Sequence, residues 1–81
     1  MNKNVWDQLK SISADELIRA LVRDGWVCEQ RGGSQQLFYK SGRRVSVHFH
    51  PGKTYGPKLL KALFVDIGWG EEDFRRLKII R

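Results

Sequence analysis

Residues Trp26–Phe49, with the sequence WVCEQRGGSQQLFYKSGRRVSVHF, hold three short runs rich in β-branched and aromatic side chains. Glycine-containing stretches separate the runs, and glycine supplies the positive φ angles that hairpin turns need. Because both connections are short, the runs predict an antiparallel meander. The predicted strands are about Trp26–Gln30, Gln35–Lys40 and Arg44–Phe49, joined at Arg31–Ser34 and Ser41–Gly42.

Side chains alternate between the two faces of a strand, so the last run has one apolar face and one polar face. The face that we expect to be core carries Val45, Val47 and Phe49. The face that we expect to be solvated carries Arg44, Ser46, His48 and His50.

Helical signals flank the strands on both sides. Ser13 and Glu16 have the spacing of a capping box, and the apolar stripe that follows them ends at Gly25. Pro57 suits the first turn of a second helix that ends at Gly68. The expected core stripes are Leu17, Ile18, Leu21 and Val22 in the first helix and Leu59, Leu60, Leu63, Phe64 and Ile67 in the second. A short third helix begins in the acidic run at 71–73, and Val5, Trp6 and Leu9 predict a docking turn near the N-terminus.

The element order is therefore α-β-β-β-α with extensions at both ends. This order predicts an α+β fold, a three-stranded antiparallel sheet with helices on one face. The 81 residues suit one domain, 1–81, with a core at about 13–68, an N-terminal extension at 1–12 and a short C-terminal helix within 69–81. A chain of this size has no room for a second catalytic lobe or a cofactor domain.

Composition narrows the class of protein further. No apolar run has the length of a membrane span, and the first residues do not form a secretory signal. Cys28 is the only cysteine, so neither an internal disulfide nor a cysteine-based zinc site is predicted. We therefore expect a cytoplasmic protein that uses no cofactor and no metal.

Positive charge is concentrated in the middle of the chain. The net charge is +6, and residues 29–58 hold six Lys or Arg side chains against Glu29 alone. Such a segment is typical of proteins that bind a polyanion, because Lys and Arg displace counterions from phosphates. A solubilising surface has the same composition, so charge alone leaves both readings open.

Two groups of residues offer candidate chemistry. The loop Arg31–Gln35 presents backbone N–H groups, a hydroxyl and a guanidinium to an oxyanion, although ordinary hairpins use the same residues. His48 and His50 project from one strand face, where they suit a shared phosphate or acid and base roles. A metal site lacks an evident third ligand, and two solvated strand-end residues give the same pattern.

Several short motifs follow one another in a specific order. They are Asp24-Gly25-Trp26 after the capped helix, Arg31-Gly32-Gly33-Ser34-Gln35-Gln36, a Gly-Arg-Arg hairpin, His50-Pro51-Gly52-Lys53 and a helix start at Gly56. From about Ser13 to Gly68 the chain resembles the HicA/YcfA-like toxins of bacterial toxin–antitoxin systems. The resemblance implies a double-stranded-RNA-binding-like domain, ribosome-independent cleavage of single-stranded mRNA, and a HicB-like antitoxin that covers the active face. From the basic segment and the Arg31–Gln35 loop we expect RNA contacts from Arg31, Gly33, Ser34, Lys40, Arg43, Arg44, Lys53 and Lys58.

The chain departs from the family at one position. The family motif is Gly-Ser-His with a catalytic His, and this chain has Gly33-Ser34-Gln35. A glutamine cannot accept and return a proton at neutral pH, whereas histidine titrates near ~6.5. Gln35 therefore marks the catalytic position, and His50 and His48 are further catalytic candidates. Strict alternation groups Gln35 with Leu37 and Tyr39, unless a bulge near Gly33 changes its side.

Three explanations of Gln35 remain open: a natural variant with lost or relocated catalysis, a substitution made to permit expression, and a member in which another histidine serves. Three functions follow. The chain is an mRNA-cleaving endoribonuclease toxin, an inactive RNA-binding module, or a protein-interaction domain without an RNA ligand. Salt-dependent RNA binding separates the first two from the third, and RNA cleavage separates the first from the second.

Overall fold

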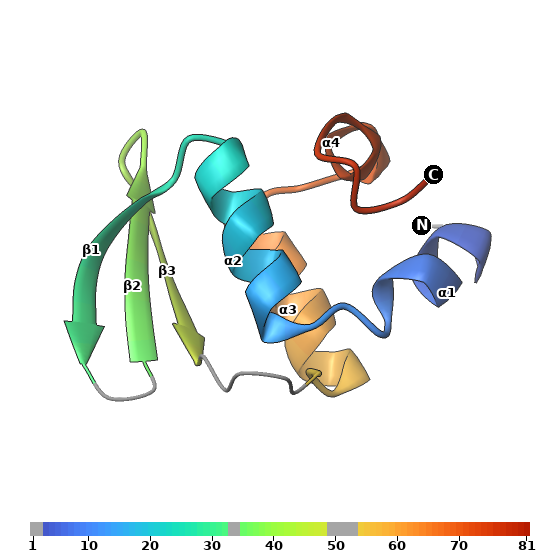
Figure 1. Ribbon diagram of the computed structural model, residues 1–81, viewed down its shortest axis with the longest axis horizontal. Coiled ribbons are helices and arrows are strands. Elements are labelled where there is room, and N and C mark those ends of the chain that lie inside the picture. Colours follow the sequence, from blue (N-terminus) through green and yellow to red (C-terminus); the bar gives the residue numbers. More distant parts are fainter. Residues whose placement is uncertain (1–2, 33–34, 49–53) are drawn as a thin grey trace.

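A computed structural model describes residues 3–32, 35–48 and 54–81. Along these residues the elements are α1 (Lys3–Leu9), α2 (Ala14–Arg23), β1 (Val27–Gly32), β2 (Gln35–Lys40), β3 (Arg43–His48), α3 (Pro57–Ile67) and α4 (Glu71–Arg76). Figure 1 shows the sheet as one layer, with α2 and α3 on one of its faces. The order and the one-sided cover confirm the predicted α+β fold class.

The sheet is a meander with the strand order β1-β2-β3, as predicted. Phe38 on β2 pairs with Val45 on β3, and both side chains are buried together with Val47. These residues form the sheet's contribution to the core beneath α2 and α3. The opposite face of the sheet is left open by the helices (Figure 1).

A bulge interrupts β1 between Cys28 and Gln30. Along β2 the pairing with β3 runs without a shift, so alternation is unbroken and Gln35 lies on the open face with Leu37 and Tyr39. The described bulge therefore leaves residue 35 on the side that strict alternation predicts.

The predicted ends of α2 are confirmed. The backbone N–H of Glu16 donates to Ser13 Oγ at 3.2 Å, and Ser13 N–H donates to Glu16 Oε1 at 3.4 Å, which completes the capping box. At the other end Gly25 has a φ of 94°, and Trp26 N–H donates to the Leu21 carbonyl at 3.0 Å. This is a Schellman ending, which favours glycine because of the left-handed backbone.

Two residues of the expected core stripes lie outside the core. The side chains of Val22 on α2 and Leu59 on α3 are 59% and 47% exposed. Each directly follows or precedes a buried residue, Leu21 or Leu60. Neighbouring residues point about 100° apart around a helix. The apolar stripe is one side chain wider than the surface that packs against the core, so its outermost member in each helix faces solvent.

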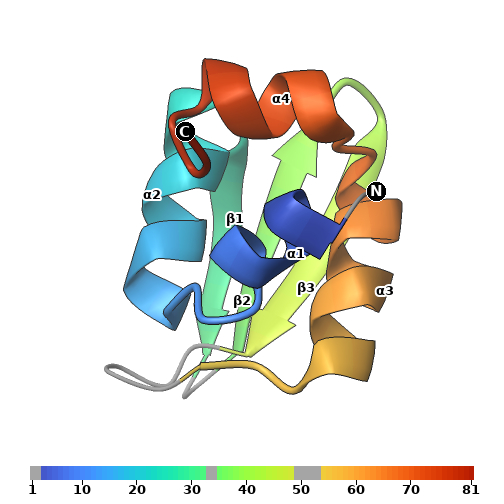
Figure 2. The ribbon, with the colours of Figure 1, turned by 90° about the vertical axis from the view of Figure 1, so that its right-hand side faces the viewer.

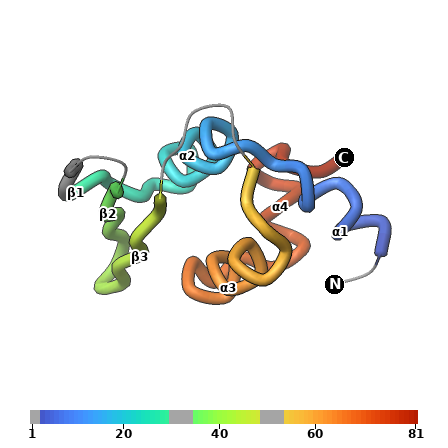
Figure 3. Tube along the Cα trace, turned by 90° about the horizontal axis from the view of Figure 1, so that it is seen from below, coloured from blue at the N-terminus to red at the C-terminus, as the bar shows by residue number. Residues whose placement is uncertain are grey.

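The N-terminal segment forms a complete helix, α1, rather than the predicted docking turn. Its buried side chains are Val5 and Leu9, and Lys61 Nζ lies 4.8 Å from the ring centroid of Trp6. Figures 2 and 3 show α1 and α4 on the side of α2 and α3 that faces away from the sheet. None of the helices in the described ranges is long and apolar enough to cross a lipid bilayer.

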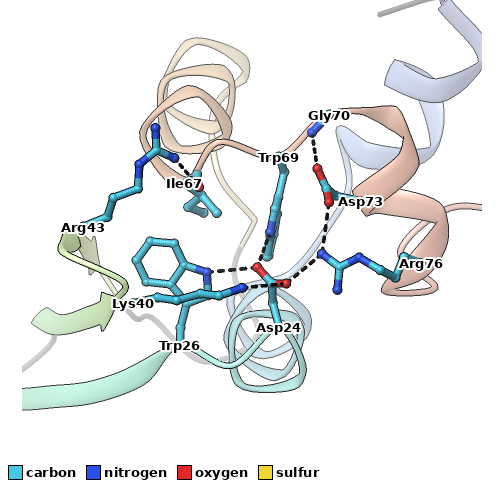
Figure 4. Close-up of polar contacts among 9 residues, drawn as sticks. All are labelled: Asp24, Trp26, Lys40, Arg43, Ile67, Trp69, Gly70, Asp73 and Arg76. Carbon is cyan, nitrogen blue, oxygen red and sulfur yellow. Dashed lines mark hydrogen bonds and ion pairs between the residues drawn. The ribbon is translucent and has the colours of Figure 1, made fainter.

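The carboxylate of Asp24 joins most of these elements at one point (Figure 4). Its Oδ2 accepts the indole N–H groups of Trp26 at 3.1 Å and Trp69 at 2.8 Å. Its Oδ1 lies 3.2 Å from Lys40 Nζ and 2.7 Å from Arg76 Nη2. The Asp24 side chain is 6% exposed, so the end of α2, the end of β2 and α4 all meet at a buried charge.

Two opposing effects set the pKa of Asp24. Burial raises it, but the hydrogen bonds from Trp69, Arg76, Lys40 and Trp26 together outweigh burial and lower it from 3.8 to about 2. A carboxyl whose pKa is lower in the folded than in the unfolded state stabilises the fold above the unfolded pKa, and this contribution is lost as pH falls through the folded value.

We therefore expect Asp24→Asn to lower the free energy of unfolding at pH 7 by at least about 2 kcal/mol. The gap between the two proteins should narrow as pH falls from about 5 to about 2, because the wild-type carboxyl then becomes neutral. Denaturant unfolding followed by circular dichroism at several pH values measures the gap. Asp7→Asn, which removes only the exposed pair with Lys10, is the control and should cost under about 1 kcal/mol. A gap for Asp24→Asn that does not change with pH would contradict this role of the charge.

Candidate nucleic-acid interface

Gln35 lies at the start of β2, on the open face of the sheet, with an exposed side chain. Its Cα partner across the ladder is His48, the last residue of β3. Its amide Nε2 donates a hydrogen bond to Ser46 Oγ, two residues earlier on β3. Directly opposed residues of an antiparallel pair have Cβ atoms about 5 Å apart, so the side chains of Gln35 and His48 start next to each other on the same face.

Tyr55 anchors the end of β3 beside this pair. Its hydroxyl donates to the backbone carbonyl of His48 at 2.8 Å, and Thr54 forms a bridge with Ser13 at the start of α2. Burial raises the pKa of Tyr55, and the charge of Asp15 raises it further, so the hydroxyl keeps the proton that it donates. Sequence reasoning missed Tyr55, because no local pattern connects it to a strand end seven residues away.

Among the described residues of β3, Arg44 is the cation on the open face of the sheet. Its Nε lies 3.0 Å from Glu29 Oε2, and its guanidinium carbon lies 5.4 Å from the ring centroid of Tyr39, its Cα partner. The hydrogen bond to Glu29 is the main reason why the pKa of Arg44 is raised. The arginine side chain is 61% exposed, and an exposed ion pair of this kind contributes little stability. A phosphate can therefore compete with Glu29 for this guanidinium.

Lys40 and Arg43, two of the predicted RNA contacts, lie at the opposite end of the sheet from Gln35, in the β2–β3 hairpin. Lys40 pairs with Asp24, and Arg43 Nη1 donates to the carbonyl of Ile67 at 3.1 Å, where α3 ends. A cation at a helix C-terminus satisfies an orphan carbonyl and the negative end of the dipole. The structure thus places these two residues on the helix side of the sheet, unlike the neighbouring Arg44, and gives each a partner within the fold.

The remaining predicted contacts are distributed as follows. Lys58 is exposed in the first turn of α3, at the end of the molecule where β2 begins and β3 ends (Figures 1 and 2). The backbone of Arg31 belongs to β1 and is the Cα partner of Gln36. Gly33, Ser34, His50 and Lys53 lie outside the described residues, as does Phe49, so their predicted roles stay predictions.

The open face also carries apolar surface. Val27 on β1 is 61% exposed, and Leu37 and Tyr39 on β2 are half-buried. The pair of residues at 35 and 48 thus shares the open face with a row of apolar side chains and with Arg44, which lies further along β3 towards the hairpin. Within the described ranges no three His, Cys, Asp or Glu side chains gather as metal ligands. The described side chains there offer hydrogen-bonding groups, a guanidinium charge and an imidazole ring.

A family model described as HicA toxin of bacterial toxin-antitoxin matches residues 14–69. The match begins at the first residue of α2 and ends two residues after α3, so it includes the sheet, the open face and the two helices that cover it. α1 and α4 lie outside the match. No curated protein and no solved structure matches the chain.

Proposed function

The chain belongs to the HicA toxin family of bacterial toxin–antitoxin systems, and from that membership we propose that it is an RNA-binding toxin with an altered catalytic position. In this proposal the open face of the sheet receives single-stranded mRNA, and Gln35 stands where the family's Gly-Ser-His motif has its histidine. The observation that carries the proposal is the place of residue 35. It is exposed, it is opposite His48 in the ladder, and it bonds to Ser46 on the face that the described helices leave open.

Cleavage of RNA without a metal uses the ribose 2′-OH as the nucleophile on the adjacent phosphate. One group must take the 2′-OH proton, another must protonate the leaving 5′ oxygen, and cations stabilise the charge that builds on the phosphorus. A histidine at position 35 opposite His48 suits this pair of roles. With Gln35 one of the two proton carriers is missing, and such a loss typically costs ~10²–10⁴-fold in rate.

Two alternatives make different demands on the same face. An inactive RNA-binding module uses the basic residues but has no use for a second histidine, and the neutral Gln35–Ser46 hydrogen bond favours it over an active wild-type enzyme. A protein-interaction domain uses the apolar row of Val27, Leu37 and Tyr39 and binds no RNA. Family membership gives the chain an antitoxin partner, so this surface has a use in either case.

Gln35→His should convert a weak or inactive protein into an RNA-cleaving one. Cleavage of a labelled single-stranded RNA should rise with pH through the histidine pKa, near ~6.5, because the base acts in its neutral form. Gln35→Asn is the matched control, since it keeps an amide that does not titrate. In the Gln35→His background, His48→Ala should lower the rate with little change in RNA affinity. Wild-type cleavage as fast as that of Gln35→His would refute the assignment of position 35.

Arg44→Ala should weaken RNA binding and reduce the slope of log K against log salt by about 0.7, the value for one single-strand phosphate contact. Arg75→Ala is a matched control, because Arg75 is 52% exposed and pairs with Glu71 much as Arg44 pairs with Glu29. Filter binding or fluorescence anisotropy over a range of salt concentrations measures both slopes. Equal slopes for the two variants would mean that Arg44 serves only solubility.

We propose that the antitoxin is HicB-like and that it docks on the open face, over the Arg31–Gln35 edge and the predicted His48/His50 edge. Val27→Lys should then weaken antitoxin binding about tenfold, or ~1.4 kcal/mol, because it places a charge in the apolar contact. Val65→Lys on α3 is the control, since Val65 is 77% exposed and lies on a helix. Hydrogen exchange should show added protection in the sheet, and protection confined to α1 and α4 would contradict this docking mode.

A further inference from the structure

A polar cleft lies between α2 and the chain segment that follows α4. Its volume is about 210 Å³, and its lining residues are Ile12, Glu16, Arg19, Arg23, Lys78 and Ile79. Figure 2 shows the segment after α4 next to the last turns of α2. The cleft has room for several waters, at ~30 Å³ each, and therefore for a group of the size of a phosphate.

The charges around this cleft are unbalanced. Arg19 and Arg23 stand four residues apart on α2, a spacing at which like charges weaken a helix, and Lys78 adds a third cation. In the described ranges none of the three forms an ion pair with a carboxylate. The carboxylate that lines the cleft, Glu16, already accepts hydrogen bonds from Ser13 N and Oγ in the capping box.

The backbone holds two of the cations in place. Arg23 Nη2 donates to the carbonyl of Leu77 at 2.7 Å, which ties the guanidinium to the segment after α4. Lys78 has a φ of 60°, the left-handed region, and ends α4 in a Schellman motif through Ile79 N–H and the Phe74 carbonyl at 2.9 Å. Glycine is the residue that adopts this conformation without strain. Lys78 thus holds a backbone conformation that favours glycine while it lines the cleft with Arg19 and Arg23.

We propose that this cleft is a second phosphate site, in which Arg19, Arg23 and Lys78 bind a backbone phosphate of the RNA. The choice of RNA as the source of the phosphate rests on the proposed function. Phosphate fits better than a carboxylate because two guanidinium forks and an ammonium offer more donors than one carboxylate can accept. Lys78 lies beyond residues 14–69, so the site depends on a segment outside the family match.

Lys78→Gly tests the proposal, because it removes the charge and relieves the strain together. We expect the melting temperature to rise by about 4 °C, the affinity for a single-stranded RNA to fall severalfold, and the salt slope to fall by about 0.7. Lys61→Ala, which removes one exposed charge on α3 outside the lining of the cleft, should leave the RNA affinity and the slope near the wild-type values. A variant that gains stability and loses RNA affinity is folded, so misfolding cannot explain the loss. Unchanged RNA binding by Lys78→Gly would overturn the proposal.

A second measurement separates this proposal from the proposed function and from other ligands. Inorganic phosphate, added to the wild-type protein, should shift the side-chain NMR signals of Arg19 and Arg23, and RNA should displace it. Phosphate binding that RNA does not affect would mean a site for free phosphate and would overturn the RNA assignment. A polyglutamate peptide that binds the cleft more tightly than RNA would indicate a protein ligand and would also overturn it. The Arg44→Ala variant separates the two surfaces. If Lys78→Gly lowers the RNA affinity and Arg44→Ala does not, the cleft is supported and the open face is ruled out as the RNA surface.

Discussion

The arrangement of the sheet and helices depends on the buried carboxylate of Asp24, which receives hydrogen bonds or ion pairs on both oxygens. Asp24 stands where α2 gives way to β1, and its two oxygens take hydrogen bonds or ion pairs from four residues, Trp26, Lys40, Trp69 and Arg76. An ionised group is stable in such a place only while its partners remain, because an uncompensated buried charge is costly. The sheet, α2 and α4 are therefore fixed to one another at the hairpin end of the molecule. The opposite end, with Gln35 and His48, is held by Tyr55.

The sheet sorts its basic residues by face. Lys40 and Arg43 lie on the helix side and hold Asp24 and the end of α3, while Arg44 lies on the open side over Tyr39. Adjacent positions in the sequence, Arg43 and Arg44, thus have different surroundings: Arg43 bonds to the end of α3, and Arg44 is exposed on the open face. A net charge summed over the middle of the chain does not distinguish these two positions. They are distinguished by the alternation of side chains along the strand, which puts every second residue on the same face.

Local signals made much of the fold predictable from the sequence. The capping box at Ser13, the left-handed glycines Gly25 and Gly68, and Pro57 each act within one turn of helix, so their effect follows from neighbouring residues. The grouping of Gln35 with Leu37 and Tyr39 also followed from alternation. The Asp24 cluster, the bond from Arg43 to Ile67 and the bulge at Glu29 join residues far apart in the sequence or depend on register, and no local pattern encodes them. Alternation placed Ser46 on the same face as Gln35, but no sequence pattern predicted the hydrogen bond between their side chains.

The open face makes few contributions to the core. Gln35 is exposed, and its side-chain bond is to a surface serine, so the fold makes little demand on the identity of this residue. Glutamine and histidine codons differ only in their third base. A gene for this domain is thus one nucleotide away from gaining or losing an imidazole at an exposed position that contributes nothing to the core. On the proposed assignment of position 35, selection on toxicity would act through this codon while the rest of the fold is retained, and copies of the gene would move between harmful and benign states without losing the domain.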